Sequence, residues 1–234
     1  MNELIYNGKH SRDFGIYISG SGTFNSPERD AETISIPGKN GDLEVSHNRF
    51  KNIAVEYPAF IVSKFKDNAA AARVWLLAAS GYHRLEDTYH SEYFRLGRFT
   101  GPLDFDMKFL NRAGEFKLQF DCKPQRFLKS GEEVLMFTAA GSIYNSTEFT
   151  ALPLIRVYGT AAGTLTIGNT IVQINAISEY VDLDCELQDA FKGSTNCNGN
   201  VYAPNFPVLS PGGTGISFSG GITKIEIKPR WWTV

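Results

Sequence analysis

Residues 115–122 read Glu115-Phe116-Lys117-Leu118-Gln119-Phe120-Asp121-Cys122, an unbroken alternation of polar and apolar side chains. Because successive side chains on a strand point to opposite faces, this pattern predicts a strand with all its apolar residues on one side. Pro124 follows and ends the pattern. Similar short alternating runs occur on both sides of this stretch, so the sequence predicts a mainly β protein.

The first half of the chain combines such strands with one helix. Alternation predicts strands over residues 14–19, 32–36, 52–57, 93–97 and 103–110. The Ala- and Leu-rich run 69–79 predicts a helix near residues 68–80, with Asp67 or Asn68 as N-cap and Gly81 just past its end. The face expected to pack on the sheet comprises Ala70, Ala71, Val74, Leu77 and Ala78.

The second half is expected to be all β. Gly168-Asn169 separates two alternating runs and predicts a two-residue hairpin turn. At least six short strands predict a β-sandwich, with a long surface loop from Lys192 to Pro211. A composition shift near Lys129 to Glu133 divides the chain into an N-terminal β domain, residues 1–138, and a C-terminal sandwich, residues 139–234.

The overall composition is that of a globular protein, 42% hydrophobic and 21% charged over 234 residues. A net charge of −2 lacks the basic excess of a dedicated nucleic-acid binder, so no sequence-specific nucleic-acid binding is expected. No apolar run reaches the roughly 18 residues of a membrane span, and residues 1–10 lack an apolar signal region, so we expect no membrane insertion.

The three cysteines, Cys122, Cys185 and Cys197, form no C-x-x-C pair. An odd number in this arrangement fits a protein that folds in a reducing cytoplasm, so free thiols are expected. Cys122 and Cys185 fall at inward strand positions, which predicts inert burial, whereas Cys197 falls in the long loop.

Catalytic signals are weak. His83 and His90 flank carboxylates in a segment that reads as a polar connector, but their spacing matches no metal-binding motif. Asp182 and Asp184 share one face of an expected strand, and the simpler interpretation is a solvated face, as it is for Asp104 and Asp106. No phosphate-binding loop or nucleophile motif occurs. We therefore expect no enzyme, no cofactor and no bound metal.

Four segments together resemble the distal tail protein (Dit) family of long non-contractile-tailed bacteriophages. Ile36 to Leu43 (IPGKNGDL) is similar to the family's "PGR-GDL" loop, with Lys39 in place of Arg, and Arg49 to Ile53 is similar to its "Y-K-N" turn. Phe120 to Phe127 (FDCKPQRF) is similar to "F-x-C-K-P-Q-R". The fourth segment is the C-terminal half, from Pro153 to Trp231. The order of these motifs, spread over essentially the whole chain, carries the resemblance.

The resemblance implies an N-terminal β-barrel-like domain with one α-helix, followed by a galectin-like β-sandwich. It also implies a structural virion protein at the distal end of a phage tail, assembled in the host cytoplasm as a homo-hexamer. Such a ring would join the major tail tube protein to a tip, fibre or receptor-binding protein. Its channel would pass the tape-measure protein and DNA.

Two sets of residues are candidates for contacts. The turn formed by Pro37, Gly38, Lys39, Gly41, Asp42 and Leu43 is rigid enough to present an edge to a neighbouring subunit, and an ordinary turn within one subunit is an equal alternative. Trp231 and Trp232 form a possible glycan platform, of which at most one ring is expected to be exposed. The alternative function is therefore a carbohydrate-binding adhesion module that recognises host cell-wall glycans.

Overall fold

The computed structural model describes residues 2–19, 25–108 and 112–234, which form two compact units. Unit 1 comprises Met1–Arg126 with Val234, and unit 2 comprises Phe127–Thr233. The division therefore falls before the boundary expected after residue 138. Residues 127–138 belong to unit 2 because β11 (Leu135–Phe137) pairs with β19 (Gly212–Lys228) of that unit.

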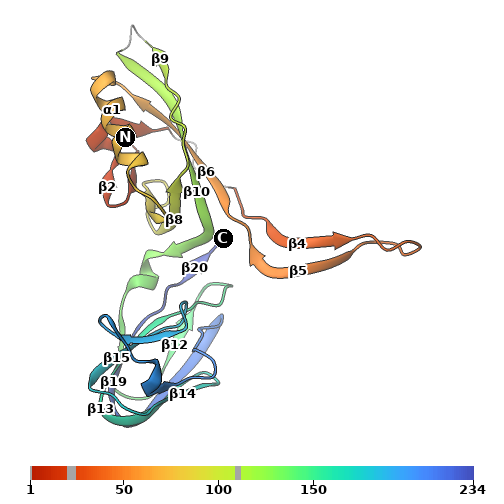
Figure 1. The fold of residues 1–234 in the computed structure, drawn as a ribbon, viewed down its shortest axis with the longest axis vertical. Helices are drawn as coiled ribbons and strands as arrows, with labels where there is room; N and C mark the ends of the chain where they lie inside the picture. Colours follow the sequence, from red (N-terminus) through yellow and green to blue (C-terminus); the bar gives the residue numbers. More distant parts are fainter. Residues whose placement is uncertain (1, 20–24, 109–111) are drawn as a thin grey trace. The chain divides into compact units, whose positions relative to one another are not determined.

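Unit 1 is a curled antiparallel sheet accompanied by one α-helix (Figure 1). The strand order is β2-β1-β7-β8-β10-β6-β3, and β9 adds to β10. A separate two-stranded sheet is formed by β4 and β5. The elements are β1 (Leu4–Tyr6), β2 (Lys9–His10), a 3-10 helix (Ser11–Phe14), β3 (Ile16–Ile18), β4 (Arg29–Ile34), β5 (Leu43–Phe50), β6 (Ile53–Ile61), α1 (Phe65–Leu77), β7 (His83–Asp87), β8 (Tyr93–Phe99), β9 (Asp106–Lys108) and β10 (Ala113–Leu128).

The strand predicted over residues 115–122 is confirmed as the centre of β10, whose inward side chains alternate as expected. Leu118, Phe120 and Cys122 are fully buried in the core of unit 1, opposite residues of β6. The strand expected over 103–110 is shorter, and residues 109–111 lie outside the described ranges.

Helix α1 confirms the predicted helix, but its ends and its packing face were predicted wrongly. It begins at Phe65, with Lys64 in a left-handed conformation (φ 47°) as N-cap, so Asp67 and Asn68 lie inside the first turn. The buried residues are Phe65, Ala69, Ala72, Trp75 and Leu76, whereas Val74 is 70% exposed. Three large side chains on one stripe determine which face packs, because an aromatic ring buries far more area than an alanine methyl.

Trp75 anchors α1 to the N-terminal strands. Its ring stacks on Phe14 with centroids 4.4 Å apart, and its indole Nε1 donates a hydrogen bond of 3.2 Å to the carbonyl oxygen of Tyr6. This bond satisfies the one polar atom that burial of the ring would otherwise leave without a partner.

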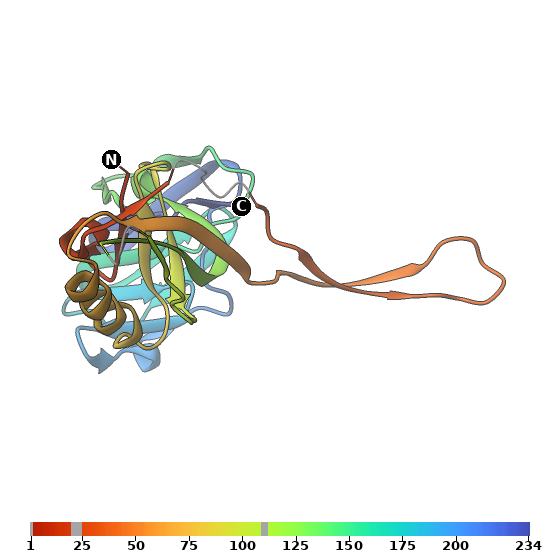
Figure 2. The same ribbon diagram turned by 90° about the horizontal axis from the view of Figure 1, so that it is seen from above.

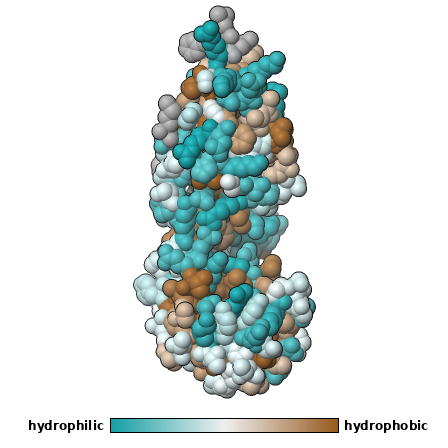
Figure 3. Space-filling view, turned by 90° about the vertical axis from the view of Figure 1, so that its left-hand side faces the viewer, coloured by the Kyte–Doolittle hydropathy of each residue, from teal (hydrophilic) through white to brown (hydrophobic). Residues whose placement is uncertain are grey.

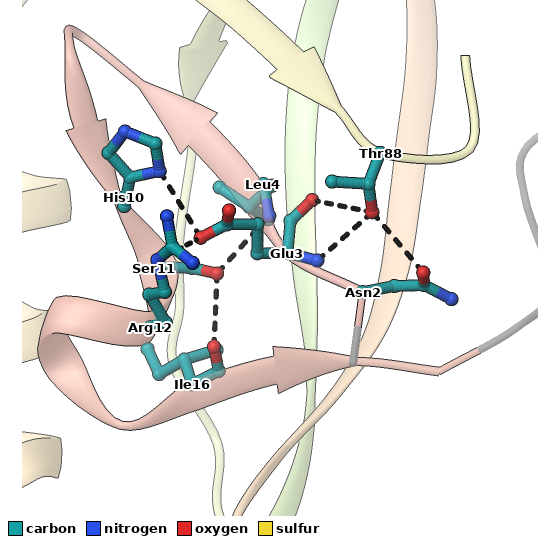
Figure 4. Close-up of polar contacts among 8 residues, drawn as sticks. All are labelled: Asn2, Glu3, Leu4, His10, Ser11, Arg12, Ile16 and Thr88. Atoms are coloured by element: carbon teal, nitrogen blue, oxygen red, sulfur yellow. Dashed lines mark hydrogen bonds and ion pairs between the residues drawn. The ribbon is translucent and has the colours of Figure 1, made fainter. Parts of the chain in front are cut away.

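A buried serine holds the N-terminal hairpin together (Figure 4). Ser11 is fully buried, and its hydroxyl accepts a hydrogen bond from the N–H of Leu4 and donates one to the carbonyl of Ile16. The carboxylate of Glu3 lies 3.2 Å from Nδ1 of His10 and 3.0 Å from Nε of Arg12. Side-chain contacts thus connect β1, β2 and β3 near the start of the chain.

Unit 2 is a β-sandwich in which two long strands belong to both layers. The first part of β13 pairs with β15 and the last part of β19, whereas its second part pairs with β14 and the first part of β19. The elements are a 3-10 helix (Lys129–Glu132), β11, β12 (Gly141–Asn145), β13 (Leu154–Ile167), β14 (Thr170–Ile174), β15 (Glu179–Asp184), β16 (Asp189–Lys192), β17 (Thr195–Asn196), a 3-10 helix (Asn198–Asn200), β18 (Val201–Tyr202), β19 and β20 (Trp232–Thr233).

The bend in β13 depends on glycine. The pairing with β19 shifts register between Gly159 and Gly163, where the two backbones approach closely. A Cβ atom at Gly163 would lie 2.5 Å from the carbonyl oxygen of Ser219, which is too close for any side chain. The two layers enclose one apolar core that includes Ile155, Leu165 and Ile225.

Two further expectations for unit 2 have clear outcomes. The hairpin at Gly168-Asn169 is confirmed, because Ile167 pairs with Thr170 across it. The long loop from Lys192 to Pro211 is wrong in part, because β17, a 3-10 helix and β18 lie within it. These strands are only two residues long, too short to produce a readable alternation. The mainly β class with one helix, followed by a sandwich, is confirmed for the described residues.

Candidate assembly interface

The hairpin of β4 and β5 extends from the sheet of unit 1 as an arm of two strands (Figures 1 and 2). Every residue from 32 to 49 is exposed. We refer to residues 29–50 as the arm. Since a two-stranded ribbon without a core is marginally stable in water, such an arm is expected to gain stability from a second surface.

One face of the arm is apolar. Ile34 lies directly opposite Leu43, and Val45 follows on the same face two residues further along β5. Their exposed fractions are 47%, 48% and 41%, respectively. Neither Ile34 nor Val45 was singled out from the sequence, where the only signal was a short alternation at 32–36. Exposed apolar side chains gathered on one element are typical of interaction sites.

The tip of the arm is the turn that the sequence singled out, with Pro37, Lys39, Asp42 and Leu43 all exposed. Gly38 and Gly41 have φ values of +81° and +80°, the left-handed region that favours glycine. A Cβ atom at either glycine would meet no other atom within 4 Å. The turn is therefore held by its own backbone conformation, without packing against the described rest of the chain.

Charged side chains pair with one another at the base of the arm. Asp30 accepts a hydrogen bond of 2.6 Å from Nε of Arg49 and lies 3.4 Å from Nδ1 of His47. The bond from Arg49 lowers the pKa of Asp30. Because the partners Arg49 and His47 are 74% and 44% exposed, we assign these pairs a role in orienting β4 against β5 and little role in stability.

The exposed side of α1 provides a second candidate surface in unit 1. Val74 and Leu77 are 70% and 61% exposed, the reverse of their predicted burial. Next to them lies a groove of about 480 Å³, lined by Asn7, Lys9, Phe14, Ala71, Val74, Trp75, Ala78 and Ala79. Figure 3 shows one face of the molecule, on which apolar patches of this kind interrupt a mostly hydrophilic surface.

The charges of these two surfaces are opposite. Around α1 and the neighbouring 3-10 helix the exposed cations are Lys9, Arg12, Lys64, Lys66 and Arg73, against two exposed anions, Asp13 and Asp67. Toward the tip of the arm the exposed anions are Glu32, Asp42 and Glu44, against one cation, Lys39. An acidic, apolar ribbon and a basic, apolar groove are electrostatically complementary.

In unit 2, Asp182 and Asp184 contradict the solvated face predicted for them. They are only 4% and 6% exposed. Arg156 donates to Asp182 at 2.7 and 2.8 Å, and Arg230 donates to Asp184 at 2.8 and 2.9 Å. Each carboxylate is thus covered by a bidentate arginine, a pairing that a period-two pattern cannot reveal. The bonds from Arg230 hold the pKa of Asp184 below its ordinary value.

The two tryptophans expected to offer a glycan platform lie against the sandwich. Trp231 is 7% exposed and packs in the core of unit 2. Trp232 is half-buried, stacks on Phe149 with centroids 4.4 Å apart, and donates from Nε1 to the carbonyl oxygen of Thr150 at 2.9 Å. Neither ring is an open platform, and glycan binding at this pair stays a prediction.

The histidine-rich segment is a strand and a turn rather than the polar connector predicted. His83 opens β7, and Leu85 is buried in the core. Asp87 ends the strand and accepts hydrogen bonds from the N–H groups of Tyr89 and His90 at 2.9 and 2.8 Å. Asp87 therefore stabilises the turn that follows β7. Within the described residues, no group of three or more His, Cys, Asp or Glu could hold a metal ion.

Cys122 and Cys185 are buried, and burial raises the pKa of each thiol to about 12. Such thiols are poor nucleophiles at neutral pH. Cys197 is half-buried, and all three cysteines are free. No helix in the described ranges has both the length and the apolar character needed to cross a bilayer.

Known structures share this architecture, although no protein-family model and no curated protein sequence matches the chain. The Dit protein of phage SPP1, described as a paradigm of the hub adsorption apparatus in phages that infect Gram-positive bacteria, is similar with a TM-score of 0.75. The alignment covers 100% of both chains at 11% identity. A chain of the phage P2 baseplate, in its activated conformation with Ca, is similar with a TM-score of 0.53 and 10% identity over 97% of each chain. The resemblance to distal tail proteins is confirmed as a shared fold.

Proposed function

We propose that this chain is a structural component of a bacteriophage tail tip or baseplate, and that it acts as a hub at the distal end of the tail. The observation that carries the proposal is the likeness to the SPP1 hub protein, which extends over both units. The likeness therefore covers the whole chain and is not limited to one widespread domain. A structural role needs no catalytic group, and the polar clusters described above each have a structural explanation.

The arm suggests how copies of this chain would assemble. The apolar face and acidic tip of one copy's arm would dock in the basic groove beside α1 of the next copy. These are two different surfaces, so the contact is head-to-tail and closes into a ring when the rotation between copies allows it. The turn from Pro37 to Leu43 would then be a contact between subunits, the first of its two expected roles.

The proposed ring is a homo-hexamer with a central channel. It would bind the major tail tube protein on one side and a tip, fibre or receptor-binding protein on the other, while the tape-measure protein and DNA pass through. These partners follow from the proposed hub role. Assembly would take place in the host cytoplasm, in agreement with three free thiols.

Light scattering on the purified chain, alone and with its tail tube protein, tests this proposal. Six chains of 26.0 kDa give a mass of six times 26.0, about 156 kDa. Gly41→Val strains the tip by about 1–3 kcal/mol because of the positive φ, and Val74→Asp places a charge in the groove. We expect both variants to shift the mass toward that of the monomer.

Val62→Asp is the matched control, since Val62 is an exposed valine of unit 1 (51%) outside the arm and the groove. It should leave the ring intact. A ring that persists in both test variants would contradict the arm-to-groove contact while leaving the hub role open. A wild-type chain that stays monomeric even with the tube protein would contradict the hub role itself.

A further inference from the structure

Asparagine followed by glycine occurs three times in the chain, at Asn7-Gly8, Asn40-Gly41 and Asn198-Gly199. This dipeptide is chemically labile, because the backbone nitrogen of the glycine can attack the side-chain carbonyl carbon of the asparagine with no Cβ atom in the way. The attack requires rotation of the backbone and of the asparagine side chain, so the surrounding structure decides how fast it occurs. The three copies in this chain lie in three different surroundings.

Asn198 is held by its side chain. Its Nδ2 atom donates a hydrogen bond of 2.6 Å to Asp189, and its Oδ1 atom accepts one of 2.7 Å from the N–H of Ala190. The residue also starts the 3-10 helix Asn198–Asn200. Both polar atoms of the amide are thus occupied, and an attack on its carbon would have to break both bonds.

Asn7 is held by its backbone. Together with Gly8 it forms the two-residue turn between β1 and β2, with φ values of 51° and 72°. Tyr6 pairs with Lys9 across this turn, and the N–H of Asn7 donates to the carbonyl oxygen of Arg84 at 3.0 Å. Rotation of the backbone here would disrupt both contacts, next to a tyrosine that is fully buried.

Asn40 has neither restraint. It is exposed in the loop of residues 35–42, which joins the two strands of the arm (Figure 2). Within the described part of the chain, no hydrogen bond holds its side chain or the N–H of Gly41. A backbone bond of 3.1 Å from Lys39 to Ile36 ends before the pair. The space around the reacting groups is open, because a Cβ atom at Gly41 would meet nothing within 4 Å.

We propose that Asn40 is a self-modification site, which converts to isoaspartate and aspartate in the isolated chain. The backbone nitrogen of Gly41 gives up its proton and bonds to Cγ of Asn40, and Nδ2 leaves as ammonia with that proton. Water then opens the resulting succinimide ring. Cleavage between the nitrogen and the backbone carbonyl carbon gives isoaspartate, and cleavage between the nitrogen and Cγ gives aspartate.

The conversion changes the tip of the arm in two ways. A neutral amide becomes a carboxylate two residues before Asp42, so the tip becomes more acidic. Isoaspartate also carries the main chain through the former side chain, which adds a methylene group to the backbone of the arm. The reaction depends on the local structure of the tip and not on the proposed hub function.

The test is to age the purified chain in neutral and in alkaline buffer and to map its peptides by mass spectrometry. The peptide that contains Asn40 should gain the mass of an amide-to-acid conversion and separate into two products. It should do so at least about tenfold faster than the peptides of Asn7 and Asn198, because the restraining hydrogen bonds add to the barrier at those two sites. Alkaline buffer should accelerate the change, since the attacking nitrogen has to lose its proton.

Asn40→Gln is the matched control, because it keeps the amide but would have to close a larger ring, and it should stay unmodified over the same period. In urea the three asparagines should convert at similar rates, since unfolding removes the restraints. Equal rates at the three sites of the folded chain would overturn the proposal. A full difference that persists in urea would overturn it as well, because the difference would then come from neighbouring residues and not from the fold.

Discussion

The arm of unit 1 and the sandwich of unit 2 are both antiparallel β structures, but the arm exposes its side chains whereas the sandwich buries many of them. Residues 32–49 of the arm are all exposed, and at its base Asp30 pairs with the exposed Arg49. In the sandwich, β13 and β19 share a core, and even the carboxylates of Asp182 and Asp184 are buried beneath arginines.

This difference separates two uses of the same secondary structure. The sandwich has an apolar core of its own, and its two buried carboxylates are paired with arginines of the same unit, so we expect it to fold by itself. The arm has backbone hydrogen bonds but no core, so its apolar face becomes useful only when another surface covers it. A region that has its own core can thus be distinguished from a region that needs a partner surface by whether its apolar residues are buried or exposed.

Hydrogen exchange should show the largest contrast between the two regions. Amides of β5 in the isolated chain should exchange at least about a thousandfold faster than central amides of β13, because local opening of the arm costs little. Mass spectrometry of exchanged peptides measures both in one experiment. Equal protection of β5 and β13 in the monomer would show that the arm is stable without a partner, whereas new protection of β5 on assembly would show that a partner covers it.

Removing a carboxylate should affect the two regions differently. Asp184→Ala leaves Arg230 without its bidentate partner in a mostly buried site, and should lower the free energy of unfolding by about 2–3 kcal/mol. Asp30→Ala in the arm, where the partners Arg49 and His47 are exposed to solvent, should leave the urea midpoint unchanged. A similar shift in both variants would mean that burial does not decide the contribution of these pairs.

Acid should reveal the same pair with a smaller effect. Folding lowers the pKa of Asp184, so the folded state binds its proton less readily than the unfolded state. The stability from this group is therefore present above its unfolded pKa of about 4 and is lost as pH falls through the lower folded value. Urea midpoints measured at about pH 6 and about pH 3 should fall less in Asp184→Asn than in the wild type. Equal losses would show that other carboxylates carry the acid response.

Features encoded by short-range pattern could be predicted from the sequence. The alternation at 115–122 and the Gly168-Asn169 turn both specify local geometry, and both are confirmed. The helix was predicted with the wrong face because an Ala-rich run has apolar residues on several faces. The buried face of the helix is determined by Trp75 and Phe65, which pack in the core of unit 1. The space that they fill is defined only by the tertiary structure.

Pairings between distant residues could not be predicted. Arg156 and Asp182 are 26 residues apart, and Arg230 and Asp184 are 46 residues apart. No periodicity links an arginine to its distant aspartate. Asp182 and Asp184 were therefore interpreted as an exposed strand face, although both are buried. The arm could not be predicted for a related reason. Alternation predicts that residues 32–36 form a strand, but it does not indicate whether that strand joins the main sheet.

The bend at Gly159 and Gly163 has a mechanical consequence. Because β13 and β19 pass through both layers of the sandwich and pair along nearly their whole length, neither layer can be peeled away without the other. A force that slides these two strands past each other must break their hydrogen bonds together, whereas a force on the arm opens one bond after another from its tip. The sandwich should therefore yield in a single step under high tension, and the arm gradually under low tension.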